Sequence, residues 1–143
     1  VAGEQVATMW IALDPVVNAT GAVEYIKGSH KWGQRFKAVS FKDKDMYKED
    51  LPEVPNIAAN RGQYEFVQYE MEPGDCTMHH GLTLHGAPGN SSLTQKRRAY
   101  IIRWAGDDAT YDPRPNLQPM LRDPGIPVGG PLDCELFPVV RGT

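Results

Sequence analysis

The sequence predicts an all-β domain, an antiparallel sandwich or barrel, on three observations. Five short segments carry the apolar or alternating patterns that are typical of strands. Turn residues separate these segments, since the 143 residues include 14 glycines and 12 prolines. Almost no segment shows a helical period. Because 143 residues is the length of one ordinary domain, we expect a single domain over residues 1–143.

The predicted strands follow one another with clear boundaries. They are residues 6–13, 22–27, 64–71, 76–84 and 97–104. Asp14 and Pro15 end the first strand, and the polar cluster up to Gly21 predicts a hairpin between the first two. Pro73 and Gly74 form a turn between the third strand and the fourth.

Two segments show no strand pattern. Residues 28–63 form a long loop with mixed charges, in which we expect one short helix near 45–50. Long loops in compact domains usually contact ligands or act as lids, although a decorative insertion is the alternative. After Gly106 the chain is rich in proline, and a last edge strand is expected over 132–140, where Pro138 suits an edge.

Composition and charge narrow the function. The net charge is −3 and the pI about 5.8, so the chain lacks the basic excess of a nucleic-acid-binding protein. The apolar runs are shorter than a membrane span, and no charged, apolar leader indicates secretion. Cys76 and Cys134 are too few for a disulfide framework. We therefore expect a cytoplasmic protein with reduced thiols.

Three of the four histidines fall within seven residues. On a regular strand His79 and His85 share a face, and His80 lies on the other. Non-haem iron commonly binds two histidines and one carboxylate, often as His-x-Asp or His-x-Glu. None of the four histidines has that context, and no HExxH, CxxC, GxSxG, GxGxxG or Walker loop occurs. Histidines that only form hydrogen bonds with their neighbours remain the alternative.

Two adjacent arginines open the last strand. Because side chains alternate along a strand, one of Arg97 and Arg98 faces inward. A buried guanidinium needs an anionic partner, and a carboxylate held by two hydrogen bonds suits it. The alternative is a surface arginine beside a structural salt bridge.

An ordered series of short motifs resembles the phytanoyl-CoA dioxygenase family, whose members are iron(II)- and 2-oxoglutarate-dependent oxygenases. The motifs are WIALD at 10–14, GA at 21–22, GSHK at 28–31, PGD at 73–75, LHGA at 84–87, GN at 89–90 and RRA at 97–99. The resemblance implies a partial double-stranded β-helix (jelly roll, cupin-like) with a long loop and a proline-rich tail. It further implies iron(II) as cofactor and 2-oxoglutarate as co-substrate.

The resemblance also implies roles for individual residues. His85 falls at the distal iron ligand of the family, and Arg97 at the residue that holds the C5 carboxylate of 2-oxoglutarate. Arg98 takes that place if the register slips by one. Trp10 matches a tryptophan that lines the co-substrate pocket.

One departure concerns the family's His-x-Asp pair, which lies upstream of the Trp10 strand. Residues 1–143 therefore resemble one partial domain, the C-terminal part of such an enzyme. The whole enzyme is expected to hydroxylate a small organic substrate with molecular oxygen. We expect residues 1–143 alone to be inactive and to self-associate through exposed strand edges, and we expect no nucleic-acid or membrane partner. A metal-free jelly-roll binding or structural module is the second hypothesis.

Overall fold

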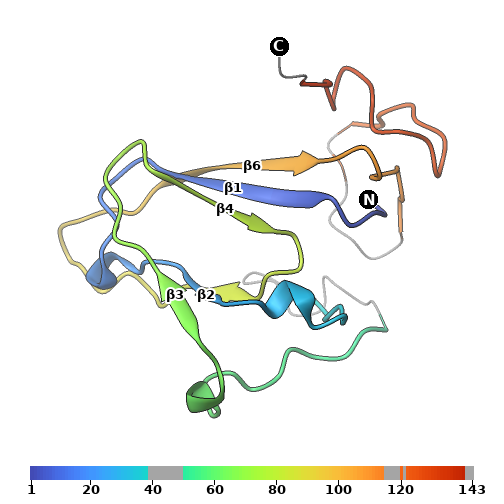
Figure 1. Cartoon of the computed structure of the whole chain (residues 1–143). Helices are drawn as coiled ribbons and strands as arrows, with labels where there is room; N and C mark the ends of the chain where they lie inside the picture. The colour runs from blue at the N-terminus through green and yellow to red at the C-terminus, as the bar shows by residue number, and fades with distance from the viewer. Residues whose placement is uncertain (39–49, 115–119, 121, 141–143) are drawn as a thin grey trace. The chain divides into compact units, whose positions relative to one another are not determined.

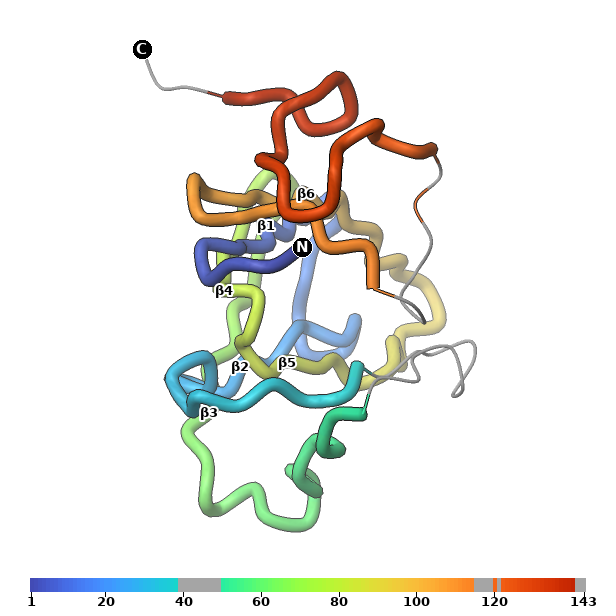
Figure 2. The backbone as a smooth tube through the Cα atoms, turned by 90° about the vertical axis from the view of Figure 1, so that its right-hand side faces the viewer, coloured from blue at the N-terminus to red at the C-terminus, as the bar shows by residue number. Residues whose placement is uncertain are grey.

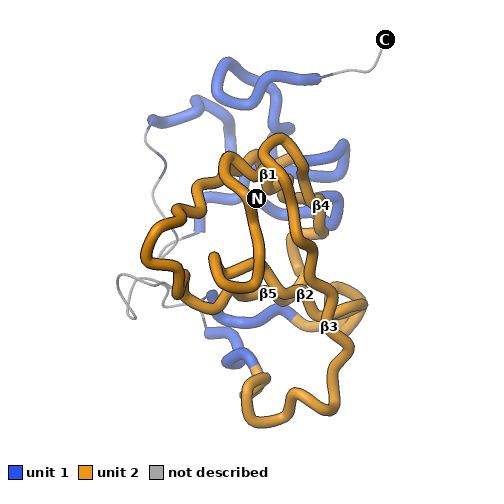
Figure 3. The backbone as a smooth tube through the Cα atoms, turned by 90° about the vertical axis from the view of Figure 1, so that its left-hand side faces the viewer, with its two compact units in different colours: residues 1–6, 35–54, 105–143 blue, residues 7–34, 55–104 orange. Residues whose placement is uncertain are grey.

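The computed structural model describes residues 1–38, 50–114, 120 and 122–140 (Figure 1). These residues form two compact units, shown in separate colours in Figure 3. The first unit takes in residues 1–6, 35–54 and 105–143, and the second residues 7–34 and 55–104. The expected helix near 45–50 lies almost wholly outside the described residues.

The described part of the chain contains six strands and three single-turn 3-10 helices, and no α-helix. The strands are β1 (Val6–Ala12), β2 (Glu24–Ile26), β3 (Phe66–Gln68), β4 (Cys76–His80), β5 (His85–Gly86) and β6 (Ala99–Ala105). The helices are η1 (Asn18–Thr20), η2 (Ser29–Lys31) and η3 (Arg61–Gln63). The all-β prediction is confirmed, although most strands are shorter than their sequence patterns.

The strands form two three-stranded sheets, in the orders β4-β1-β6 and β3-β2-β5. Figures 1 and 2 both show the two groups as separate layers. In the first sheet β1 and β4 are antiparallel, with Trp10 opposite Thr77 and Thr8 opposite His79. In the second, β2 is antiparallel to both neighbours, with Tyr25 opposite His85. Thr77 and His79 thus lie on β4 in the first sheet, and Tyr25 and His85 lie side by side in the second.

The predicted hairpin between the first two strands is wrong, because β1 and β2 belong to different sheets. The chain between them makes the η1 turn instead of a hairpin turn, and the hydroxyl of Thr20 accepts a hydrogen bond from the Val17 N–H at 3.0 Å. Val16 forms a two-way backbone bridge to Met71. These contacts turn the chain from one layer to the other.

The core of the second unit is a cluster of buried side chains from several segments. Its buried residues are Trp10, Ala12, Val16, Ala22 and Met71, with Val23 and Ala99 packed against them. Trp10 and Ala12 are two apart on β1 and so share its inward face. Apolar burial of this kind, at about 25 cal/mol per Å², is the main stabilising contribution.

The first unit has no complete strand among its described residues, and hydrogen bonds between its segments hold it together. The N–H groups of Glu4 and Gln5 donate to the carboxylate of Asp108, at 2.7 and 3.0 Å. Ala2 pairs with Thr110 in both directions, at 3.0 and 2.8 Å. The edge strand expected over 132–140 is reduced to a single bridge between Cys134 and Phe137.

Candidate functional site

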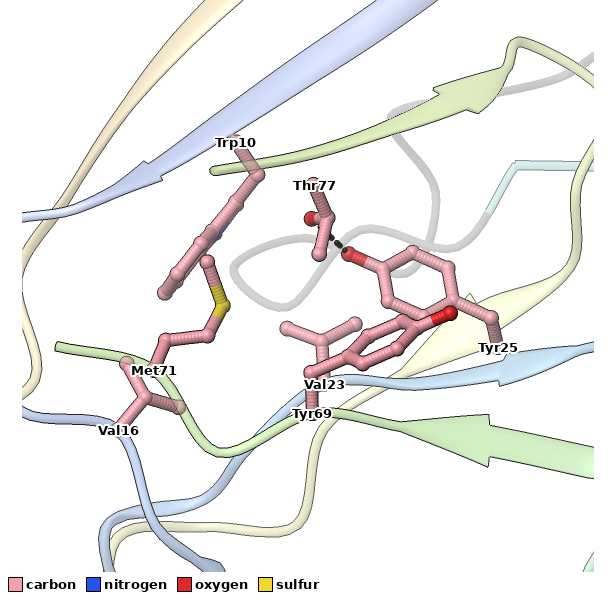
Figure 4. Close-up of a pocket in the computed structure, with 7 residues that line it drawn as sticks. All are labelled: Trp10, Val16, Val23, Tyr25, Tyr69, Met71 and Thr77. Atoms are coloured by element: carbon pink, nitrogen blue, oxygen red, sulfur yellow. Dashed lines mark hydrogen bonds between the residues drawn. The ribbon is translucent and has the colours of Figure 1, made fainter. Parts of the chain in front are cut away.

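A narrow pocket lies between the two sheets of the second unit (Figure 4). Seven residues line it: Trp10, Val16, Val23, Tyr25, Tyr69, Met71 and Thr77. Six of them are apolar or aromatic residues that approach from both layers. The pocket has room for about one water molecule. It is too small for an organic ligand, so we call these seven packed residues the floor of the site and describe next the polar residues around it.

Tyr25 and Thr77 join the two sheets by a hydrogen bond at this floor. The phenolic oxygen of Tyr25 lies 2.8 Å from the hydroxyl oxygen of Thr77, as Figure 4 shows. Tyr25 is 8% exposed, and its burial raises the pKa of the phenol above the ordinary value. The neutral phenol is thus favoured, and it fixes the spacing of β2 and β4.

Two histidines meet at the side of Tyr25. The rings of His79 and His85 are 4.6 Å apart between centroids, and each also contacts the ring of Tyr25, at 5.1 and 5.9 Å. The sequence predicted that the two histidines share a face of one strand. The structure brings them together differently, because His79 is the penultimate residue of β4 in one sheet and His85 begins β5 in the other.

The hydrogen bond of His85 determines which of its nitrogens is open. Nδ1 of His85 lies 2.9 Å from the carbonyl oxygen of Thr83. A carbonyl only accepts, so Nδ1 carries the proton and Nε2 of the neutral ring keeps its lone pair. Metal-bound histidines use this arrangement, in which the second nitrogen donates to a carbonyl. The residue at this position therefore fits an iron ligand.

The environment of His79 differs from that of His85. Burial, with a smaller contribution from nearby His85, lowers the pKa of His79 to about 4. Its Nδ1 is buried and has no hydrogen-bond partner within the described ranges. His79 is thus neutral at physiological pH and packs against the ring of His85. His80 points elsewhere, and its ring lies 5.5 Å from that of His30.

The two arginines of the RRA motif have different surroundings. The guanidinium carbon of Arg97 lies 5.6 Å from the centre of the Trp10 ring, which is within cation–π range. Among the described residues Arg97 forms no ion pair. Arg98 instead donates to the carboxylate of Asp14, through Nε at 2.9 Å and Nη2 at 2.7 Å. The structural salt bridge therefore belongs to Arg98, and Arg97 keeps its charge available.

The described residues hold no group of three or more His, Cys, Asp or Glu side chains arranged to bind a metal. No helix in the described part of the chain has the length and apolar character of a membrane span.

Tyr25 and Thr77 were not predicted from the sequence as site residues. For Thr77 a signal existed, because its spacing of two from His79 places both on one face of a strand.

A family model for phytanoyl-CoA dioxygenase (PhyH) matches residues 2–99. The fold and the site define a jelly-roll domain with an aromatic floor. Beside the floor lie His85, whose Nε2 has a free lone pair, and Arg97, which forms no ion pair with any described residue. The chain belongs to the phytanoyl-CoA dioxygenase family. This assignment confirms the resemblance that the motifs indicated, and the two antiparallel sheets are part of its jelly roll.

Two fungal relatives are dioxygenases by name. The multifunctional dioxygenase prhA of Penicillium brasilianum is 30% identical over 99 residues, which cover 69% of this chain and 28% of the relative. The dioxygenase aneA of Aspergillus aculeatus is 30% identical over 111 residues, 77% of this chain and 29% of the relative. The chain thus spans less than a third of these curated relatives.

Solved structures show the same fold. The non-heme alpha-ketoglutarate-dependent carbocyclase SnoK from nogalamycin biosynthesis matches with a TM-score of 0.65 and 28% identity, over 95% of this chain and 49% of SnoK. The epimerase SnoN, solved with Fe3+, alpha ketoglutarate and nogalamycin RO, matches with a TM-score of 0.63 and 22% identity, over 93% of this chain and 49% of SnoN. The chain spans about half of either protein.

Proposed function

We propose that the chain is the distal part of an iron(II)- and 2-oxoglutarate-dependent dioxygenase that hydroxylates a small organic substrate. The observation that carries the proposal is the open Nε2 of His85, fixed by the Nδ1 hydrogen bond to Thr83 beside the aromatic floor. Family membership and the cofactor-dependent neighbours support it. Iron(II) with 2-oxoglutarate would supply the activation of molecular oxygen.

His85 is the iron ligand in this proposal. Its bond to Thr83 at 2.9 Å orients the ring and raises the basicity of Nε2. The other ligands of a facial triad would come from a His-x-Asp pair. His79, neutral and half-buried against His85, helps to keep the ring in place and limits the approach of water.

Arg97 binds the C5 carboxylate of 2-oxoglutarate in the proposal, and Trp10 forms the wall beside it. An unpaired guanidinium offers two parallel N–H groups to a carboxylate. The Trp10 ring, 7% exposed and 5.6 Å from the guanidinium carbon, restricts the arginine to a few orientations. A clamp fixed before the ligand arrives loses less entropy on binding.

The 28–63 loop is the proposed substrate-contacting segment, and its two ends within the second unit are anchored. The rings of Trp32 and Tyr64 are 5.8 Å apart. Arg61 donates two hydrogen bonds of 2.9 Å to the carboxylate of Glu24, and its guanidinium carbon lies 4.1 Å from the centre of the Phe66 ring. The described ends of the loop are thus held on the second unit.

Residues 1–143 alone bind iron(II) weakly and do not turn over 2-oxoglutarate in this proposal, because His85 is the one family-matched ligand among them. The test compares the chain with a longer one that carries an upstream His-x-Asp pair. We expect tight anaerobic iron(II) binding and succinate formation in the longer chain alone, and loss of both in its His85→Ala variant. A longer chain that binds no iron would favour the metal-free jelly-roll module.

Two further properties belong to the proposal. Outer strands of three-stranded sheets present unpaired backbone groups, so we propose self-association of residues 1–143 through these edges. Sedimentation at increasing protein concentration tests it, and a constant monomer mass would contradict it.

Free Cys76 and Cys134 fit a reducing compartment, so we propose a cytoplasmic location, which fractionation of the source cells tests.

A further inference from the structure

Asp14 and Arg98 form a contact that neither the floor nor the histidine pair requires. Asp14 lies two residues after β1, and Arg98 immediately precedes β6, the neighbour of β1 in the sheet. The carboxylate accepts three hydrogen bonds from Arg98, which are the backbone N–H at 2.7 Å, Nε at 2.9 Å and Nη2 at 2.7 Å. Both carboxylate oxygens take part, so the contact fixes direction as well as distance.

The backbone of Arg98 is held on both sides. Its N–H donates to Asp14, and its carbonyl oxygen accepts from the N–H of Leu13 at 3.0 Å. The N–H bond therefore orients the peptide plane between Arg97 and Arg98, and the carbonyl bond orients the plane between Arg98 and Ala99. Because neighbouring side chains of an extended chain point to opposite sides, fixing Arg98 toward Asp14 directs Arg97 away from it, and Arg97 lies over Trp10.

We propose that Asp14 is a positioning residue for Arg97, which it directs onto Trp10 chiefly through its hydrogen bond to the backbone N–H of Arg98. The inference rests on the proposed function for what Arg97 binds, and on the structure alone for where Arg97 lies. Asp14 does not touch the co-substrate in this proposal.

The surroundings of Asp14 agree with such a role. Its side chain is 15% exposed, whereas that of Arg98 is 67% exposed. The hydrogen bonds from Arg98, from the side chain first and the backbone second, hold the pKa of the Asp14 carboxyl at about 2. The carboxylate thus stays charged at every pH at which an oxygenase is assayed. Because the Arg98 guanidinium is largely exposed to solvent, the ion pair contributes little to stability, and the fixed direction is the main consequence of the contact.

The variants separate the parts of the contact. Asp14→Ala removes all three hydrogen bonds, whereas Asp14→Asn keeps an oxygen for the Arg98 N–H and is the milder variant if the first does not fold. Arg98→Ala is the matched control, because it removes the guanidinium and leaves the backbone bond to Asp14. Circular dichroism melts establish that each variant is folded.

The first readout uses residues 1–143 and needs no iron. Nuclear magnetic resonance measures the ring-current shift that Trp10 imposes on the Arg97 side chain, with Trp10→Leu, which has no aromatic ring, as the reference for its loss. We expect Asp14→Ala to lose most of the shift, Asp14→Asn part of it, and Arg98→Ala little. An unchanged shift in folded Asp14→Ala and Asp14→Asn would overturn the inference.

The second readout uses the longer chain with the upstream His-x-Asp pair. We expect Asp14→Ala to raise the KM for 2-oxoglutarate by about tenfold and to leave kcat at saturating 2-oxoglutarate nearly unchanged, with Asp14→Asn in between. A loss of kcat with an unchanged KM would overturn the inference. If the ring-current shift responds but the longer chain does not use 2-oxoglutarate, the proposed function fails while the positioning by Asp14 stands.

Discussion

The guanidinium carbon of Arg97 lies 5.6 Å from the ring centre of Trp10, which is itself part of the buried core. One residue thus serves both packing and the candidate binding site. Replacing each residue in turn separates the contribution to stability from the contribution to ligand binding. The Trp10 ring is buried in the core, so its loss should lower stability, whereas Arg97 is only half-buried.

Trp10→Ala is expected to destabilise the chain by about 3–5 kcal/mol, the usual loss for a buried aromatic residue. Arg97→Ala is expected to change stability by less than about 1 kcal/mol. In the longer chain, however, Arg97→Ala should abolish 2-oxoglutarate binding, measured by calorimetry. Normal binding by this variant would exclude Arg97 as the clamp, and the same test would then pass to Arg98.

The Tyr25–Thr77 hydrogen bond is expected to be a coupled pair. Tyr25→Phe and Thr77→Val should each cost about 0.5–1.5 kcal/mol of unfolding free energy, since each leaves a partner in a largely apolar pocket. The double variant should cost less than the sum, because the second change removes an already unpaired group. Urea unfolding measures all four proteins, and strict additivity would mean that the bond contributes nothing.

His79 predicts a pH dependence of stability. Its folded pKa is about 4 and its ordinary value 6.5, so between these values the unfolded chain binds more protons than the folded chain. The contribution is therefore complete above pH 6.5 and is lost as the pH falls toward 4. After allowance for screening of a half-exposed ring, the loss is about 1–2 kcal/mol.

Thermal melts of residues 1–143 between pH 7 and pH 4 measure this loss. The matched variant is His79→Phe, which keeps a ring against Tyr25 and His85 and cannot be protonated. It should show a flatter profile than the natural chain. Equal slopes for the two proteins would show that another group titrates over this range.

Two glycines with positive φ are expected to differ in their tolerance of alanine. Gly21 has φ +83°, and a Cβ there would lie 2.5 Å from the carbonyl oxygen of Pro88, whereas Gly28 has φ +75° and open space around it. Gly28→Ala should cost about 1 kcal/mol for the backbone conformation alone. Gly21→Ala should cost about 2–4 kcal/mol, because the clash adds to that strain. Similar melting temperatures for both variants would contradict this account.

The sequence alone was enough for the class of fold and for the outline of the strands. Alternation and turn residues predicted strands that overlap β1, β2, β3, β4 and β6, because a strand with one buried face must repeat every two residues. They did not predict the two-residue strand β5, whose pattern is too short to recognise. The ordered motifs also identified the family, since they depend on residue identity and order and not on contacts.

Only the tertiary structure decided which segments pair and which side chains meet. Alternation fixes the faces of a strand but not its neighbours, so β1 and β2 were wrongly joined in a hairpin. The contact between His79 and His85 arises across two sheets. Alternation also predicted that the side chains of Arg97 and Arg98 point to opposite sides of the chain, but it did not determine which of them faces the core. The carboxylate of Asp14, 84 residues away along the chain, binds Arg98, and that long-range contact leaves Arg97 over Trp10.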